Sequence, residues 1–164
     1  MAELGVAARL NNEQIKIAIS EVISEIDSIT ALKPEQELAL VEFLSGKDVL
    51  AVLPTGFGKS LIYQLAPLVT KKLDPDSKTI FIVVSPLVAL MEDQIKEATK
   101  LGVAAAQLGV QSITDIEQGS YQLVFGSPEA WLLNQKWLKM LQSPVYRDHV
   151  KGIVVDEVHV AYKW

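Results

Sequence analysis

A lysine and a serine stand directly after a glycine-spaced turn in the stretch PTGFGKS. Gly56 and Gly58 let the backbone wrap closely around a ligand, because glycine tolerates dihedral angles that a side chain would penalise. Lys59 and Ser60 occupy the expected start of a helix, where unpaired N–H groups and the positive end of the helix dipole attract anions. This arrangement suits a phosphate chain, with the lysine at the β and γ phosphates and the serine hydroxyl on Mg²⁺.

The alternative for this turn is a glycine-rich loop with an exposed lysine. A phosphate site requires a strand before the turn and a helix after it, and the sequence predicts both. The usual pattern begins with glycine five residues before Gly58, where this chain has Leu53. Phe57 occupies a variable loop position, and we expect its φ to be negative, since a bulky residue at positive φ is strained.

An acidic pair, Asp156 and Glu157, follows the apolar run GIVV near the end of the chain. Mg²⁺ on a nucleotide needs a further oxygen ligand, and hydrolysis needs a group that positions the attacking water. We expect Asp156 to hold the metal through water and Glu157 to orient the nucleophile. Taken alone, such a pair can equally be a solvated turn, and His159 alone would be a structural or surface residue.

Composition limits the class of protein. The 164 residues fit one domain with a sizeable core. They are 49% hydrophobic, without an apolar run near the roughly 20 residues that cross a bilayer. The net charge of −5 argues against nucleic-acid binding by bulk positive potential. The absence of cysteine excludes disulfides and thiolate zinc sites in these residues and indicates a reducing, intracellular setting, and no secretory signal is visible.

Two helices and a strand are expected before the glycine turn. Isoleucine and valine recur at helical spacing over residues 15–26 after a possible N-cap at Asn11 or Asn12. A second helix is expected from Pro34 to Gly46. Its expected buried residues are Leu38, Val41 and Leu44. A strand over residues 48–53 should follow, and then a helix from about residue 58 to Lys71 and Lys72.

Strands and helices alternate through the rest of the chain. The expected strands are TIFIVV, a short one over residues 103–108, YQLVF and GIVV. Ser85 with Pro86, and Ser127 with Pro128, are expected to cap two helices. The first should carry Leu87, Met91, Ile95 and Ala98 on one face, and the second Trp131, Leu138 and Leu141. With a short helix over residues 112–118, this order predicts an α/β fold with a doubly wound parallel sheet and ligands at the carboxyl ends of its strands.

Five motifs occur in one order: LKPEQ, PTGFGKS, VVSPLVALMEDQI, GSPE and VVDEVHVAYKW. Together they resemble the first RecA-like domain of RecQ-family DNA helicases, which are DExH-type superfamily 2 ATPases. The resemblance covers residues 30–164 and implies a RecA-like P-loop NTPase with a mostly parallel sheet flanked by helices. It leaves residues 1–29 as an N-terminal helical segment and implies a partial ATP-binding domain, incomplete at the C-terminus.

The resemblance implies nucleotide-binding roles for several residues. Lys33 and Gln36 match the residues that read adenine, although the aromatic residue that stacks on the base in the family is replaced by Ile29 and Leu32. Positions that match the phosphate loop and the metal site are Thr55, Gly56, Phe57, Gly58, Lys59, Ser60 and Asp156. Glu157 and Lys59 match catalytic positions, and His159 matches the residue that couples hydrolysis to the motor.

Contacts with DNA are implied as well. Ser85, Pro86 and Gln94 match a segment that touches single-stranded DNA, as do Ser127 and Pro128. Helix N-termini can hold backbone phosphates regardless of sequence. The alternative is that each Ser-Pro pair only begins a helix.

The implied function is the ATP-binding portion of an ATP-dependent DNA helicase that moves 3′ to 5′ and uses ATP and Mg²⁺. Its implied partners are single-stranded or partly duplex DNA and a second RecA-like domain, which supplies arginines to the ATP site. We expect an intracellular protein without a membrane partner, nuclear if eukaryotic.

In RecA-like sheets the strand after the acidic motif inserts between the phosphate-loop strand and the acidic strand. We therefore expect a helicase fragment or truncated product that cannot unwind DNA and is poorly stable alone. The alternatives are a P-loop module that binds nucleotide without turnover and an RNA-directed DExH relative.

Overall fold

Residues 11–157 are described by the structure, a computed structural model. They divide into two units, one ending at Pro75 and the other beginning at Asp76. Among these residues, no helix has both the length and the apolar character needed to cross a membrane.

The first unit contains three helices, α1 (Asn12–Ser24), α2 (Pro34–Leu44) and α3 (Lys59–Leu73), each in contact with the other two. The predicted cap of α1 is confirmed: the Asn11 side chain accepts a hydrogen bond from the Glu13 N–H at 2.9 Å. The Gln14 side chain accepts in return from the Asn11 N–H at 3.4 Å, which completes a capping box. Local residue types therefore set where this helix begins.

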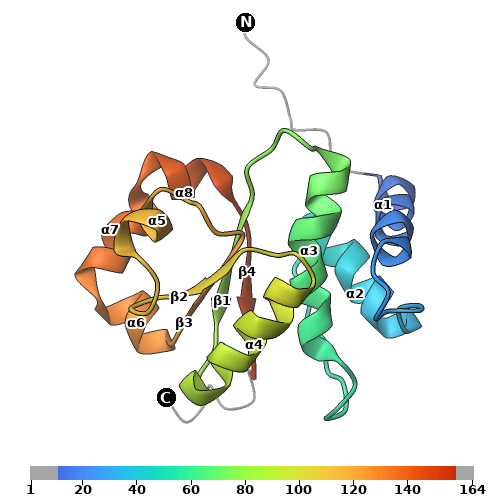
Figure 1. Cartoon of the computed structure of the whole chain (residues 1–164), viewed down its shortest axis with the longest axis horizontal. Coiled ribbons are helices and arrows are strands. Elements are labelled where there is room, and N and C mark those ends of the chain that lie inside the picture. Colours follow the sequence, from blue (N-terminus) through green and yellow to red (C-terminus); the bar gives the residue numbers. More distant parts are fainter. Residues whose placement is uncertain (1–10, 158–164) are drawn as a thin grey trace, which may run out of the picture. The chain divides into compact units, whose positions relative to one another are not determined.

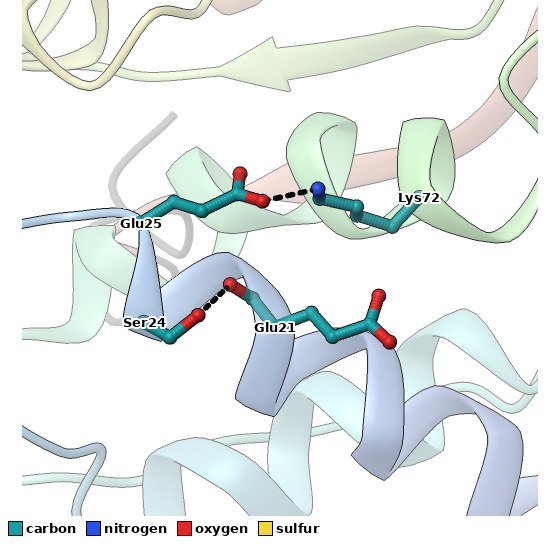
Figure 2. Close-up of polar contacts among 4 residues, drawn as sticks. All are labelled: Glu21, Ser24, Glu25 and Lys72. Carbon is teal, nitrogen blue, oxygen red and sulfur yellow. Dashed lines mark hydrogen bonds and ion pairs between the residues drawn. The ribbon is translucent and has the colours of Figure 1, made fainter.

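The ends of α1 and α3 are joined by an ion pair. Figure 2 shows the Lys72 ammonium donating to the Glu25 carboxylate, while the Ser24 hydroxyl donates to the Glu21 carbonyl at 2.6 Å. Hydrogen bonding to Glu25 raises the pKa of Lys72. The two helices are also in contact with each other, and Ile15 and Ile19 of α1 and Val69 of α3 are buried.

One predicted core position in α2 is wrong. Leu38 is 63% exposed, whereas Val41 is buried and Leu44 is half-buried. Gln36 and Leu40 are also buried. Leu38 lies two residues from each of these, about 200° around the helix, so it must face away from them.

The predicted strand over residues 48–53 is also wrong, because the structure has no strand there. Val49, Leu50 and Val52 are exposed by 40%, 76% and 84%. A strand needs a neighbour for its backbone N–H and C=O groups. In the described part of the chain, strand pairing involves only segments of the second unit.

The second unit contains the predicted parallel sheet. Its strands are β1 (Ile80–Val84), β2 (Ala105–Gln107), β3 (Leu123–Gly126) and β4 (Val150–Val155), in the order β2-β3-β1-β4. All three pairings are parallel. The carboxyl ends of β1, β3 and β4 therefore lie at one edge.

Five helices connect these strands: α4 (Val88–Lys100), α5 (Ile113–Glu117), α6 (Pro128–Leu133), α7 (Gln135–Gln142) and α8 (Pro144–His149). Helix α4 connects β1 to β2 and so runs toward the β2 edge of the sheet. Helix α5 connects β2 to β3, and α6–α8 connect β3 to β4, so both of these connections run in the opposite direction. Because crossovers are right-handed, α4 lies on the face opposite to α5–α8. Figure 1 shows α5–α8 gathered on one side of the strands.

A buried cluster joins α5–α8 to the sheet. It contains Ile80 and Ile82 of β1, Trp131 of α6, Trp137 of α7 and Tyr146 of α8. The Tyr146 hydroxyl donates to the Ile116 carbonyl at 2.6 Å inside this cluster. Burial, and to a smaller degree the charge of Glu117, raises the pKa of Tyr146.

Two predicted helix features need correction. Helix α4 begins at Val88, with Leu87 as its N-cap and no side-chain cap, so Ser85 does not cap it. The helix expected after Ser127 is two helices, because the chain is extended at Asn134, whose side chain accepts from the Lys136 N–H at 3.0 Å and caps α7. Asparagine caps helices well, and this is why the chain starts a new helix here.

Candidate functional site

The glycine turn has the positive-φ glycines that its sequence predicts, and helix α3 follows it as expected, but the predicted strand does not precede it. Gly56 has φ of 79° and Gly58 has φ of 90°, both in the left-handed region. Phe57 is not among the positive-φ residues, so its predicted negative φ is confirmed. Its N–H donates to the Pro54 carbonyl at 3.1 Å and closes the turn.

The N-terminus of α3 has the electrostatics of an anion site. Gly58 is its N-cap, without a side-chain cap, and no acidic residue lies in the first turn. Lys59 is the first helical residue and Ser60 the second. The positive charge of Lys59 is unfavourable beside the positive end of the helix dipole. A bound anion would neutralise the charge of the lysine and that of the helix end.

Lys33 and Gln36 hold this turn from the start of α2. The Lys33 ammonium donates to the Phe57 carbonyl at 3.0 Å and lies 4.1 Å from the centre of the Phe57 ring. The Gln36 side-chain amide donates to the carbonyls of Phe57 at 3.2 Å and Gly58 at 3.0 Å. Its oxygen accepts from the Lys33 N–H at 2.9 Å. Gln36 is 5% exposed.

These contacts orient the peptide groups of the turn. In a trans peptide the C=O and N–H groups point in opposite directions. With the Phe57 and Gly58 carbonyls turned toward α2, the N–H groups of Gly58 and Lys59 point away from it. Gln36 was expected to bind adenine, but in the structure its side-chain N–H groups donate to the loop carbonyls. In the residue order Lys-Pro-Glu-Gln, Lys33 is the N-cap of α2 and Gln36 is the third helical residue. Glutamine at this position commonly accepts from the backbone N–H of the N-cap, so the sequence could have predicted this one hydrogen bond.

The acidic pair lies at the carboxyl end of β4. The Asp156 N–H donates to the Val84 carbonyl at 2.9 Å and continues the β1–β4 pairing. Its carboxylate accepts from the Glu157 N–H at 2.9 Å and from the Gln94 side chain at 3.0 Å. Glu157 has φ of 54°, a left-handed conformation that is uncommon for this residue type and frequent at functional sites.

The two serines assigned to DNA contact lie at the same edge as Asp156, because they follow the paired residues Val84 and Gly126. Ser85 is buried, and its N–H donates to the Gly126 carbonyl at 3.0 Å. The Ser127 hydroxyl accepts from the Ala130 N–H at 3.1 Å, so it is the N-cap predicted for α6. Pro128 follows as the first residue of that helix.

Oxygen groups suited to Mg²⁺ are present in both units. Mg²⁺ prefers a few protein oxygens together with water and nucleotide phosphates. The Ser60 hydroxyl and the Asp156 carboxylate have this chemistry. Among residues 11–157, no three His, Cys, Asp or Glu side chains form a cluster that could hold a metal by themselves. His159 lies outside the described residues.

Known proteins resemble this chain over most of its length. It is 32% identical over 155 residues to the putative ATP-dependent DNA helicase Q1 of Caenorhabditis briggsae. The matched region covers 88% of this chain and 24% of that protein. It is 32% identical over 151 residues to the ATP-dependent helicase SGS1 of Saccharomyces cerevisiae, covering 87% of this chain and 10% of that one. These relatives confirm the resemblance to RecQ-type helicases, and the chain spans about a quarter of the Q1 protein.

The fold has a counterpart among solved structures. The UvsW helicase of bacteriophage T4 matches with a TM-score of 0.55 at 15% identity, over 93% of this chain and 62% of that one. This likeness shows the RecA-like α/β fold. The DEAD/DEAH box helicase profile matches residues 33–164, and the chain therefore belongs to the DEAD/DEAH box helicase family.

Proposed function

We propose that this chain is the ATP-binding portion of an ATP-dependent DNA helicase that moves 3′ to 5′. The observation that carries the proposal is the start of α3, where uncapped N–H groups, Lys59 and the absence of acidic residues in the first turn favour a phosphate chain. Membership of a helicase family and similarity to DNA helicases support the substrate. Residues 30–164 would belong to the helicase ATP-binding domain, and residues 1–29 would precede it as an N-terminal segment that contains α1.

Each polar group would have a separate role in the reaction. Thr55, Gly56, Phe57 and Gly58 would form the loop around the phosphates, and Lys59 would neutralise charge on the β and γ phosphates. Ser60 and Asp156 would hold Mg²⁺, which when bound stabilises the charge that develops on the transferred phosphate. Glu157 would orient the attacking water. The loop belongs to the first unit and the acidic pair to the second, so their joint binding of one nucleotide is part of the proposal.

The DNA would run along the edge that carries Ser85, Pro86, Ser127 and Pro128. These side chains are neutral. With a net charge of −5, the chain would bind DNA through local contacts to its backbone and not through a bulk positive potential. A second RecA-like domain would complete the ATP site, and His159 would couple the site to movement. In a eukaryote such a protein acts in the nucleus.

Two substitutions test these roles. Lys59→Ala should weaken ATP binding by about 10- to 100-fold, since a charge-assisted contact is worth about 1.5 to 3 kcal/mol. Glu157→Gln should keep ATP binding and abolish DNA-stimulated hydrolysis. Binding is measured by isothermal titration calorimetry and hydrolysis by phosphate release, with Lys71→Ala, at the other end of α3, as the control.

Unchanged ATP affinity in Lys59→Ala would contradict the phosphate site. Tight ATP binding by the unmodified chain without any DNA-stimulated hydrolysis would favour the alternative of a nucleotide-binding module without turnover. Stimulation by RNA but not by DNA would favour an RNA-directed relative.

A further inference from the structure

Gln94 of α4 is half-buried, and its side-chain amide lies beside the acidic pair. Its nitrogen donates to Asp156 Oδ2 at 3.0 Å. Its oxygen is buried and has no hydrogen-bond partner among the described residues. The reverse orientation of the amide would place two oxygen acceptors against each other, so Asp156 determines which way the group points.

Asp156 is thereby held at both carboxylate oxygens. Glu157 N–H donates to Oδ1 at 2.9 Å while Gln94 donates to Oδ2, and the Asp156 N–H is bound to the Val84 carbonyl. These contacts come from α4, from Glu157 as the next residue in the chain, and from β1. Hydrogen bonds to both oxygens fix the orientation of the Asp156 carboxylate.

We propose that Gln94 is a positioning residue for Asp156 and not a DNA contact. The inference rests on the proposed function, in which Asp156 holds Mg²⁺ through water. A neutral amide donor orients the carboxylate without competing for the cation, as partners of metal ligands commonly do.

The unpartnered oxygen of Gln94 points to a second part of the same role. A buried acceptor without a donor is unfavourable, and such groups in native structures call for an explanation. Water molecules around a bound Mg²⁺ are strong donors, because the cation polarises their O–H bonds. We infer that the Gln94 oxygen accepts from such a water when the metal site is filled.

Two variants of the 164-residue chain test this. Gln94→Met keeps the length of the side chain and removes both hydrogen-bonding atoms, and Gln94→Glu replaces the donor with an oxygen that repels Asp156. Binding of Mn²⁺ in the presence of ATP is followed by electron paramagnetic resonance. Binding of ATP and of a single-stranded thymidine oligonucleotide is measured in EDTA, where no divalent metal is present.

Both variants should raise the Mn²⁺ concentration at half-saturation, on the order of 10-fold, as expected for loss of a partner of a metal ligand. Affinities for ATP and DNA in EDTA should stay unchanged. Glu92→Gln, on the same helix but exposed and paired with Lys96 at 3.2 Å, is the control and should leave all three affinities unchanged.

Unchanged Mn²⁺ affinity in a folded Gln94→Met protein would overturn the inference. Loss of DNA binding in EDTA at unchanged Mn²⁺ affinity would instead assign Gln94 to DNA. The Asp156→Asn variant distinguishes a failure of this inference from a failure of the proposed function. If Asp156→Asn also binds Mn²⁺ with unchanged affinity, Asp156 holds no metal, and the metal-binding role proposed for Asp156 is wrong.

Discussion

At the scale of single residues, Gly58 is the most constrained position of the loop. Its φ of 90° disfavours any side chain, and a Cβ added there would lie 2.6 Å from the Gln36 amide nitrogen. That nitrogen donates to the carbonyls of Phe57 and Gly58. Glycine suits this position because of the backbone angle, and an added Cβ would in addition displace the Gln36 amide from its contacts.

We expect Gly58→Ala to destabilise the protein by more than the 1 to 2 kcal/mol or so that the left-handed region costs an L-residue. Its ATP affinity should fall too, because the displaced Gln36 no longer orients the loop carbonyls. The free energy of unfolding is measured in urea and ATP binding by calorimetry.

Gly46→Ala is the matched control for this prediction. Gly46 has φ of 92°, but no atom lies within 4 Å of the Cβ that the substitution adds. The control should show the backbone cost with unchanged ATP affinity. Equal effects of the two substitutions on stability and binding would show that the contact with Gln36 is unimportant.

At the scale of elements, the start of α6 distinguishes a structural from a DNA-binding serine. The Ser127 hydroxyl accepts from the Ala130 N–H at 3.1 Å and caps the helix. The Trp131 indole N–H donates to the Val83 carbonyl at 3.3 Å and ties the same helix to β1. The serine thus has a structural role whether or not DNA binds.

Two substitutions of Ser127 separate these roles. Ser127→Ala should lower the free energy of unfolding by about 1 kcal/mol through loss of the cap. Ser127→Asp should keep the cap and the stability, since aspartate caps equally well, and should weaken binding of single-stranded DNA by repelling its phosphates. Stability is measured in urea and DNA binding by fluorescence anisotropy.

Ser120→Ala serves as the control, because Ser120 is an exposed serine outside the helices. Unchanged DNA affinity in Ser127→Asp would leave Ser127 with the structural role alone.

At the scale of the whole molecule, the second unit depends on the cluster between its sheet and α5–α8. Tyr146 is fully buried there, and its hydroxyl donates to the Ile116 carbonyl. Because burial raises the pKa of Tyr146 in the folded state, the neutral phenol contributes stability below its ordinary pKa of about 10. That stability is lost as the pH rises further, because the unfolded chain then ionises first.

We therefore expect the stability of the second unit to fall with rising pH above about pH 10. Tyr146→Phe should make this fall shallower. At neutral pH the same substitution should cost about 1 to 3 kcal/mol, since the Ile116 carbonyl loses its buried donor. Urea unfolding followed by tryptophan fluorescence measures both effects, because Trp131 and Trp137 lie in this cluster.

Tyr121→Phe is the matched control, since Tyr121 is half-buried and packs against the same cluster. It should leave both the neutral stability and the alkaline pH dependence close to those of the unmodified chain. An equally steep alkaline loss in Tyr146→Phe would contradict the assignment to Tyr146.

The sequence by itself determined the features that depend on a few neighbouring residues. The N-cap at Asn11, the negative φ of Phe57, the glycine turn before α3 and the parallel sheet of alternating strands and helices after residue 76 were all predictable. Each follows from backbone sterics, from the caps that side chains form, or from apolar spacing. These properties act within about one turn of helix or one strand.

Only the tertiary structure decided which distant groups meet. The apolar run over residues 48–53 reads as a strand, yet a strand exists only where another backbone pairs with it. Spacing likewise gave no sign that Gln94 would bind Asp156, 62 positions away, or that Gln36 would hold the Phe57 and Gly58 carbonyls. Hydrogen bonds between such residues depend on how whole elements pack, and residue spacing along the chain carries no record of that packing.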